Sequence, residues 1–202
     1  HKDVYQHSLT VLRQAVQLET EYAKRAMRNA EGDVGESVAE QAQDTAKKAT
    51  VDPEFTAPDF IVRFAALMHD VGKPATRKFA PGGAVTFYHH DVVGAKLTRS
   101  RMKALNFDKE TTTKVARLVE LHLRFYGYGD AGWTDSAVRR YVTDAGDLLT
   151  RLHILTRSDV TTRNRRKAER LAFAYDDLER RIEALAQKEA IGAIRPDPVS
   201  YT

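Results

Sequence analysis

The amino-acid sequence predicts an all-α protein: a helical bundle with one short β-hairpin and a C-terminal amphipathic helix. Three observations lead to this prediction. Apolar residues recur with the helical period along almost the whole chain. The one strand-like region is 77–88, where Gly82-Gly83 form a turn between two short runs. The length of 202 residues supports one domain with an appendage.

The periodicity predicts seven helices, near residues 3–25, 58–70, 90–105, 110–123, 134–144, 147–161 and 164–190. The string Thr56-Ala57-Pro58-Asp59 marks the start of the second helix, with a capping residue, an early proline and an early acid. Residues 28–57 contain two glycines, a proline and few large apolar residues. We therefore expect a mobile insertion there.

The last predicted helix has a clear apolar stripe with charged residues on its other faces. The stripe consists of Leu171, Tyr175, Leu178, Ile182 and Leu185, at spacings of four and three. Such a helix must cover something. Packing on its own domain is the first interpretation, and contact with a missing tail or self-association with another subunit is the alternative.

The composition excludes several classes of protein. A hydrophobic fraction of 42% is enough for a packed core, and no apolar run approaches the roughly 20 residues that span a bilayer. The absence of cysteine excludes disulfides and thiolate catalysis, and it fits a cytoplasmic protein. Lys and Arg exceed Asp and Glu by 32 − 28 = 4, which is compatible with an RNA partner and does not require one.

The most informative motif is His69-Asp70, which lies at the end of the apolar helix predicted at 58–70. His69 follows Ala65 by four residues and Val62 by seven, so it shares their buried face. Gly72 and Pro74 then stop the helix. An adjacent imidazole and carboxylate in this position can bind one metal ion.

Four further candidates occupy similar settings on separate predicted helices: His7, His90, His122 and Asp159. Burying a polar group without a partner costs about 1–3 kcal/mol, so several of them on core-facing stripes suggest a common partner. One or two divalent cations would satisfy them, with His90 and His122 serving a second metal or the substrate. Each residue alone could instead be a hydrogen-bonded core residue, and Asp159 could cap a helix or pair with Arg157 or Arg163. His1, His89 and His153 are weaker candidates.

This ligand set predicts hydrolysis of a phosphoester. A metal held by imidazole and carboxylate lowers the pKa of bound water from about 16 towards 7 and makes it a nucleophile. Asp70 would bridge two metals, and Lys73 would meet a phosphate oxygen, although it could also be a solvated cation in a loop. Nitrogen and oxygen ligands admit Mn, Ni, Fe, Co, Zn or Mg without choosing among them.

A second theme is RNA binding. Basic residues gather in two places, Arg139 with Arg140 and Arg163, Arg165, Arg166 with Lys167. An aromatic loop follows His122 and contains Phe125, Tyr126, Tyr128 and Trp133. Cations attract phosphates and aromatic rings can stack on bases. The alternative is a solvated basic face and a loop packed into its own core.

The order of the candidate ligands resembles the HD superfamily of metal-dependent phosphohydrolases. Six segments resemble, more closely, the HD region of actinobacterial CCA-adding tRNA nucleotidyltransferases, also described as poly(A) polymerases: HKDVYQHSLTVL, HDVGKPATR, TFYHHDVVGAK, LVELHLRFYGY, WTDSAVRRYV and RSDVTTRN. The resemblance implies an HD domain at 1–162 and a helical extension at 163–202 that leads to a missing tail. The N-terminal nucleotidyltransferase head, with its Gly-Gly and Val-Arg-Asp signature, is absent from this sequence. Asp91 stands where that family often has Glu.

We therefore expect a phosphohydrolase domain of an RNA-processing enzyme that cannot add CCA by itself. The expected partners are tRNA or another RNA 3′ end and a nucleotide or phosphoester substrate. A stand-alone hydrolase of small nucleotides and a non-catalytic tRNA-docking module are the two alternatives.

Overall fold

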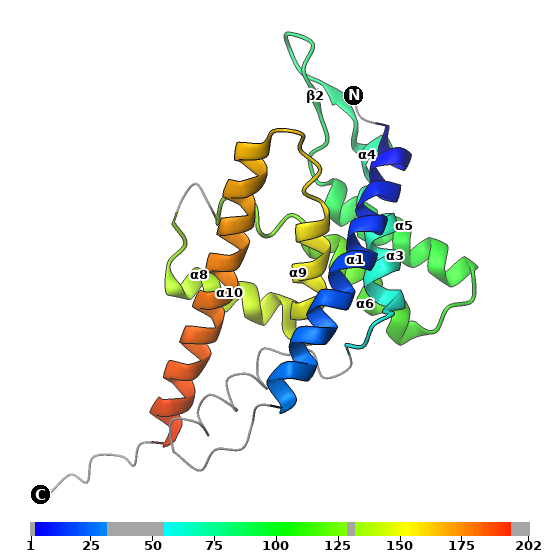
Figure 1. Ribbon diagram of the computed structural model, residues 1–202. Helices are drawn as coiled ribbons and strands as arrows, with labels where there is room; N and C mark the ends of the chain where they lie inside the picture. The colour runs from blue at the N-terminus through cyan, green and yellow to red at the C-terminus, as the bar shows by residue number, and fades with distance from the viewer. Residues whose placement is uncertain (1–2, 32–54, 129–131, 195–202) are drawn as a thin grey trace, which may run out of the picture.

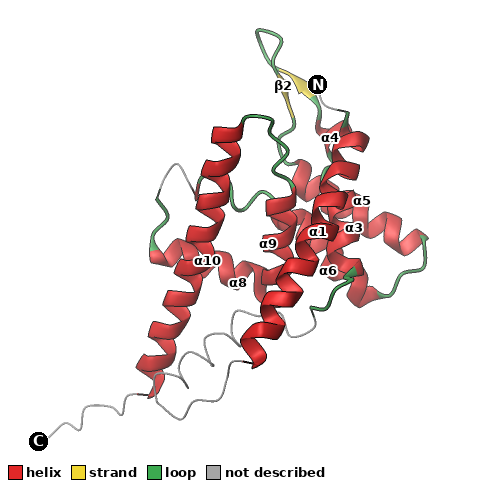
Figure 2. Ribbon diagram, in the orientation of Figure 1, coloured by secondary structure: helices red, strands yellow, loops and turns green. Residues whose placement is uncertain are grey.

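The computed structural model describes residues 3–31, 55–128 and 132–194, and it confirms the all-α class (Figures 1 and 2). In chain order the elements are α1 (Val4–Glu31), α3 (Phe60–Met68), α4 (Lys73–Thr76), β1 (Lys78–Phe79), β2 (Val85–Thr86), α5 (His90–Ala104), α6 (Lys109–Leu121), α8 (Asp135–Ala145), the 3-10 turn η1 (Gly146–Leu148), α9 (Leu149–Ser158) and α10 (Arg165–Ile194). The two strands form an antiparallel hairpin, with Lys78 opposite Thr86 and Phe79 opposite Val85. Among the described helices, none combines the length and apolarity needed to cross a membrane.

One apolar core joins the helices α1, α3, α6 and α9. Each contributes side chains that are fully or almost fully buried, among them Val11, Val62, Leu118, Leu152 and Leu155. These residues are the ones that the helical period places on one face of each helix. Burial of each large side chain stabilises the fold by about 1.5–3 kcal/mol, so the core fixes how the helix ends lie relative to one another.

Gly72 allows the turn after α3 to lie directly against the start of α5. A Cβ atom at this position would lie 2.2 Å from the carbonyl oxygen of His90 and 2.7 Å from the amide nitrogen of Gly94. Both neighbours are backbone atoms and cannot move aside. The glycine is therefore required for the close approach that brings Asp70 next to His90.

The start of α3 is held by a buried polar cluster. Asp59 is the N-cap, and its carboxylate accepts a hydrogen bond from the Val62 amide at 2.7 Å. The same side chain accepts a second bond from Arg151 of α9 at 2.8 Å. Glu19 of α1 accepts from the Asp59 amide at 3.1 Å and pairs with Arg63. These bonds connect α1, α3 and α9.

The helix α10 packs on its own domain. Tyr175, Leu178 and Ile182 are buried in the common core, and Leu171 and Leu185 lie against it. A second set of contacts, the α10 network, consists of Tyr22, Arg25, Arg157, Asp176 and Glu179. Glu179 accepts a hydrogen bond from Tyr22 and pairs with Arg157 at 3.1 Å and Arg25 at 3.0 Å, and Arg157 also pairs with Asp176 at 2.7 Å. This supports the first interpretation of the apolar stripe. Self-association stays a prediction.

Most helix boundaries lie within a few residues of those expected, and the following differences are informative. α1 continues to Glu31, six residues beyond the expected end, so residues 28–31 are helical rather than part of an insertion. Residues 32–54 of the expected insertion lie outside the described residues, and Phe55 is buried in the core. α3 begins at Phe60 because Asp59, not Thr56, is its cap. Pro74, which was expected only to stop a helix, also begins the short α4, because proline fits the first turn of a helix.

Candidate metal centre

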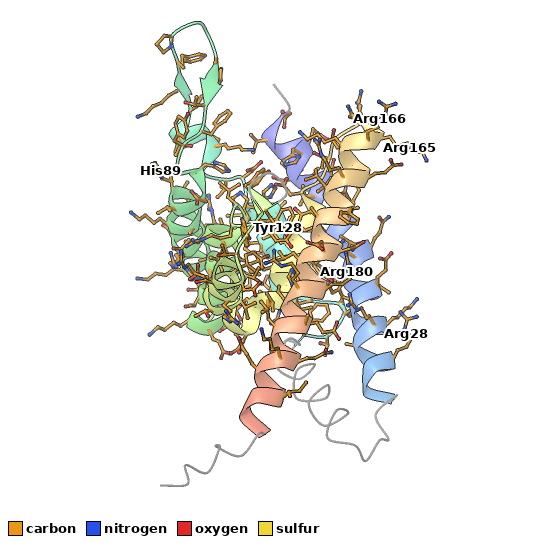
Figure 3. All side chains as sticks on the ribbon, turned by 90° about the vertical axis from the view of Figure 1, so that its left-hand side faces the viewer. Arg28, His89, Tyr128, Arg165, Arg166 and Arg180 are labelled. Atoms are coloured by element: carbon orange, nitrogen blue, oxygen red, sulfur yellow. The ribbon has the colours of Figure 1, made fainter. Side chains whose placement is uncertain are left out.

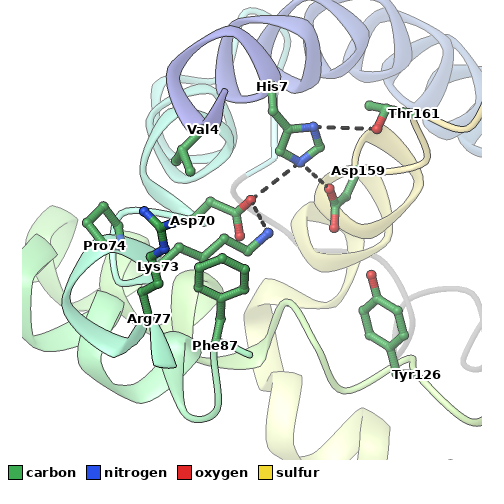
Figure 4. A pocket seen from close by; sticks show the side chains of 10 residues that line it. All are labelled: Val4, His7, Asp70, Lys73, Pro74, Arg77, Phe87, Tyr126, Asp159 and Thr161. Atoms are coloured by element: carbon green, nitrogen blue, oxygen red, sulfur yellow. Dashed lines mark hydrogen bonds and ion pairs between the residues drawn. The ribbon is translucent and has the colours of Figure 1, made fainter. Parts of the chain in front are cut away.

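The six expected ligands come from the ends of five helices and form two groups of three. Figure 4 shows three of them, His7, Asp70 and Asp159. His7 lies in the first turn of α1, and His90 is the first residue of α5. The others follow the last residues of helices: His69 and Asp70 after α3, His122 after α6, and Asp159 after α9. Helix ends converge here because the shared core sets the helices side by side.

The first ligand group consists of His7, His69 and Asp159, which each place one ligand atom within 4.8 Å of the others. His7 Nε2 lies 2.9 Å from Asp159 Oδ1, and His69 Nε2 lies 3.5 Å from the same oxygen. Asp159 therefore faces two imidazoles, and its partners are neither Arg157 nor a helix N-terminus. This geometry suits a cation held by two nitrogens and a carboxylate oxygen.

The second ligand group consists of Asp70, His90 and His122, and all three are buried. Asp70 lies between the two groups. Its Oδ1 is 3.3 Å from His90 Nε2 and 3.9 Å from His122 Nε2. Its Oδ2 is 3.4 Å from both His7 Nε2 and His69 Nε2. One carboxylate thus faces both groups, as a bridging ligand would.

Three of the imidazoles are oriented by the backbone of the segment just before them. The Nδ1 atoms of His69, His90 and His122 lie 2.8, 2.8 and 2.6 Å from the carbonyl oxygens of Ala66, Phe87 and Val119, each three residues earlier. For His69 and His122 these are carbonyls of a last helical turn, which lack a partner within the helix. Donation from Nδ1–H satisfies them and leaves Nε2 facing the centre. A hydrogen bond of this kind is the usual outer support of a metal-binding histidine.

Two of these Nε2 atoms have no hydrogen-bond partner. Within the described residues, three buried side-chain polar atoms are unpartnered: His90 Nε2, His122 Nε2 and Tyr141 Oη. Such an atom costs about 1–3 kcal/mol. Two in one group of ligands indicate a missing partner, and a divalent cation fits a donor set made only of nitrogen and oxygen atoms.

The charges of the centre are strongly coupled. Burial alone would lower the pKa of His69, but hydrogen bonds to Asp159 and Asp70 outweigh it and raise the pKa to about 10. Burial and the neighbouring His69 lower the pKa of His122 to about 4. For Asp70 and Asp159, burial would raise the pKa, but hydrogen bonds to His69 and other neighbours hold it well below its usual range. A protonated His69 thus balances the negative charges of Asp70 and Asp159 at the position where a metal ion would bind.

The two carboxylates open into a pocket of about 490 Å³ (Figure 4). Its walls carry two cations, Lys73 and Arg77, and two aromatic rings, Phe87 and Tyr126. Lys73 Nζ donates to Asp70 Oδ2 at 2.6 Å. Arg77 and Phe87 were not expected in the site. Arg77 follows Lys73 by one helical turn, a spacing that places both on one face and that could have identified it.

The expected RNA-binding residues do not form one surface. Arg163, Arg165, Arg166 and Lys167 are exposed at the start of α10, shortly after Thr161, which lines the pocket. Figure 3 shows Arg165 and Arg166 at this end of α10. Arg139 pairs with Glu189, near the other end of α10, and Arg140 is its neighbour on α8. With a rise of 1.5 Å per residue, Arg166 and Glu189 are about 35 Å apart along the helix.

The aromatic side chains of the loop after His122 also lie in two different places. Phe125 and Tyr128 are buried in the core, and Trp133 packs against it. The alternative interpretation, a loop packed into its own core, therefore holds for these rings. Tyr126 is exposed and lines the pocket instead.

Of the weaker histidine candidates, His89 is exposed, His153 is buried beside Tyr141 and His1 lies outside the described residues.

The geometry is that of a helical domain that gathers histidines and aspartates at one end. The model of the HD domain family matches residues 4–164, so the chain belongs to this family. HD domains bind divalent metals. The curated relatives include the A-adding tRNA nucleotidyltransferase of Deinococcus radiodurans, 34% identical over 144 residues, and the CC-adding tRNA nucleotidyltransferase of Thermus thermophilus, 48% identical over 62 residues. These alignments cover 70% and 30% of this chain but only 30% and 14% of the relatives.

Proposed function

We propose that this chain is a metal-dependent phosphohydrolase domain of a tRNA nucleotidyltransferase or poly(A) polymerase-like protein. The observation that carries the proposal is the pair of ligand groups joined by Asp70, of which the second is fully buried and holds two nitrogens without hydrogen bonds, His90 Nε2 and His122 Nε2. Unsatisfied imidazole nitrogens that face a carboxylate have a clear use as metal ligands.

In this proposal His7, His69, Asp70 and Asp159 hold the first ion, and Asp70, His90 and His122 hold the second or bind the phosphate. When bound, the ion supplies a water of lowered pKa as the nucleophile. Asp70 orients the two ligand groups around its two oxygens. Mn, Ni, Fe, Co, Zn and Mg all suit these ligands.

Lys73 and Arg77 bind the phosphate of the substrate. Both line the pocket beside Asp70, and Lys73 Nζ lies within 2.6 Å of its carboxylate. The Lys73 ammonium group would be able to turn from Asp70 towards the phosphate oxygens if that carboxylate held a metal ion. Two positive side chains at this position stabilise the charge that develops when the phosphoester is cleaved.

The relatives suggest that the substrate is part of an RNA-processing reaction in the cytoplasm. Two of them are named as tRNA nucleotidyltransferases, and the basic start of α10 comes shortly after Thr161, which lines the pocket. We propose that Arg163, Arg165, Arg166 and Lys167 attract tRNA or another RNA 3′ end. Arg139 and Arg140 would contact a more distant part of it.

The proposal is tested first by metal content, measured by plasma mass spectrometry on wild type, Asp70→Ala and the control Asp91→Ala. Asp91 follows His90 but belongs to neither ligand group. One or two equivalents of metal in wild type and Asp91→Ala, lost in Asp70→Ala, would support the site and identify the metal for phosphatase assays. A wild type that stays metal-free after incubation with Mn, Ni and Zn would overturn the proposal and leave a tRNA-docking module.

A further inference from the structure

The hairpin projects beyond the helical body, at the end that carries the pocket (Figures 1 and 2). No acidic residue occurs from 71 to 90, although 28 acids in 202 residues would give about three in a stretch of that length. The same stretch carries Lys73, Arg77 and Lys78. Lys73 pairs with Asp70, so Arg77 and Lys78 give the hairpin its positive charge.

The hairpin also exposes large aromatic side chains. Phe79 is 68% exposed and Tyr88 is 73% exposed. The guanidinium of Arg77 lies 4.9 Å from the centre of the Phe79 ring. Neither ring stabilises the fold by burial, and an exposed cation beside an exposed ring is the combination that binds single nucleic-acid strands through phosphates and bases.

The hairpin is continuous with the candidate metal centre. Arg77 precedes β1 and Phe87 follows β2, and both side chains line the pocket with Asp70 and Lys73 (Figure 4). A strand that lies along the hairpin would thus reach the ligand groups at its end. The pocket volume of about 490 Å³ lies within the range of sites that hold small ligands. It suits one terminal nucleotide rather than a longer segment.

We infer that the hairpin is a binding surface for the end of a single-stranded oligonucleotide. Phe79 and Tyr88 stack on the bases near the end, Arg77 contacts a phosphate, and the terminal nucleotide enters the pocket between Phe87 and Tyr126. The inference rests on the proposed function and specifies its substrate: the phosphorylated end of a strand rather than a free nucleotide.

The test uses the 202-residue chain and a fluorescein-labelled 12-nucleotide single strand with a 3′-phosphate, in chelator, with binding followed by fluorescence anisotropy. Phe79→Ala should raise Kd about tenfold, because stacking on one base is lost. Phe173→Ala is the matched control: Phe173 is 67% exposed and lies 5.9 Å from Arg180, but on α10. It should leave Kd unchanged. Circular dichroism verifies that both variants are folded.

Two further measurements test whether the hairpin contacts the phosphates and the sugars of the strand. Arg77→Gln should lower the slope of log Kd against log salt by about 0.7, the value for one phosphate contact on a single strand. RNA and DNA strands of the same sequence show which sugar is preferred, and a preference for either supports a strand-binding surface. Equal Kd values for wild type and Phe79→Ala on both strands would overturn the inference.

An activity assay separates this inference from the proposed function. With the metal-loaded protein, Phe79→Ala should lower the ratio of kcat/KM for the 12-nucleotide strand to kcat/KM for a 3′-mononucleotide about tenfold. Phe173→Ala should preserve the ratio. If neither substrate is hydrolysed, the proposed function fails, whereas the binding measurement still decides whether the hairpin holds a strand.

Discussion

The candidate metal centre and the α10 network are both polar clusters, yet they differ in burial and in how their atoms are paired. His69, Asp70, His90 and His122 are buried, whereas Glu179 and Arg157 are partly buried and Arg25 and Asp176 are exposed. In the α10 network, Glu179 has three partners and Arg157 has two acids. In the metal centre, His90 Nε2 and His122 Nε2 have no hydrogen-bond partner, although Asp70 Oδ1 lies 3.3 and 3.9 Å away. Tyr141 Oη, the third unpartnered atom within the described residues, stands alone rather than in a group of ligands. A polar cluster whose atoms are all paired holds the fold together, whereas one that leaves two nitrogens without hydrogen bonds indicates a ligand.

The largest expected difference between the two clusters concerns activity. Loss of an outer partner of a metal ligand costs about 10–100-fold, so loss of a shared ligand should cost more. We expect Asp70→Asn to lower kcat/KM for phosphoester hydrolysis at least about a thousandfold. Glu179→Gln, assayed below its melting temperature, should change it less than about threefold, since the α10 network touches neither ligand group. Equal losses would remove the distinction.

Stability should show the opposite order. Glu179→Ala removes a partner of both Arg157 and Tyr22. The Glu179–Arg157 pair is partly buried, so we expect a cost of about 1.5–3 kcal/mol, the range for a hydrogen bond to a charged group. His122→Leu loses the bond from Nδ1 to the Val119 carbonyl, but it also removes the unpartnered Nε2 and puts an apolar side chain in a buried place, so it should cost less than about 1 kcal/mol. Urea unfolding in chelator measures both. A His122→Leu protein as unstable as Glu179→Ala would contradict the comparison.

A bound metal ion should stabilise the protein through the candidate metal centre and not through the α10 network. An ion at a hundred times its Kd adds about 2.7 kcal/mol to the free energy of unfolding. We expect this increment in wild type and in Glu179→Ala, and a smaller one in His122→Leu at the same metal concentration. Thermal unfolding with and without metal measures it. Equal increments in all three proteins would show that His122 does not contribute to binding.

Metal affinity should rise with pH. The pKa of His69 is raised to about 10, so near neutral pH the imidazole holds a proton that a metal must displace. One displaced proton means a tenfold gain in affinity, about 1.4 kcal/mol, per pH unit. Chelator competition with Mn between pH 6.5 and 8.5 measures the slope, with His153→Leu as a control expected to keep it. An affinity independent of pH would show that no proton is displaced.

The last prediction concerns acid stability beside the α10 network. Burial lowers the pKa of His153 to about 4, below its unfolded value of about 6.5. The unfolded chain therefore takes up this proton first, and the stability that His153 contributes falls as the pH drops from 6.5 to 4, by at most about 1.4 kcal/mol per unit. Urea unfolding in chelator at several pH values should show a shallower decline in His153→Leu. Identical profiles would contradict the prediction.

Much of the fold follows from local sequence rules. The helical period predicts the class and the helices from Phe60 onwards to within a few residues, and Gly82-Gly83 predicts the hairpin. The missed features depend on choices that the local sequence leaves open. Thr56 and Asp59 can both cap a helix, and the buried Arg151 selects Asp59. Pro74 can end one helix or begin another.

The candidate site, like the fold, could be predicted from the sequence only in part. The sequence by itself determined the ligand types, because each of His7, His69, His90, His122 and Asp159 lies where a core-facing stripe begins or ends. Only the tertiary structure decided how they combine: Asp70 faces both groups, two imidazole nitrogens lack partners, and Arg77 and Phe87 reach the pocket. The physical reason is that periodicity specifies the face of each helix, whereas distances between helices arise from packing, such as the contact of Gly72 with α5.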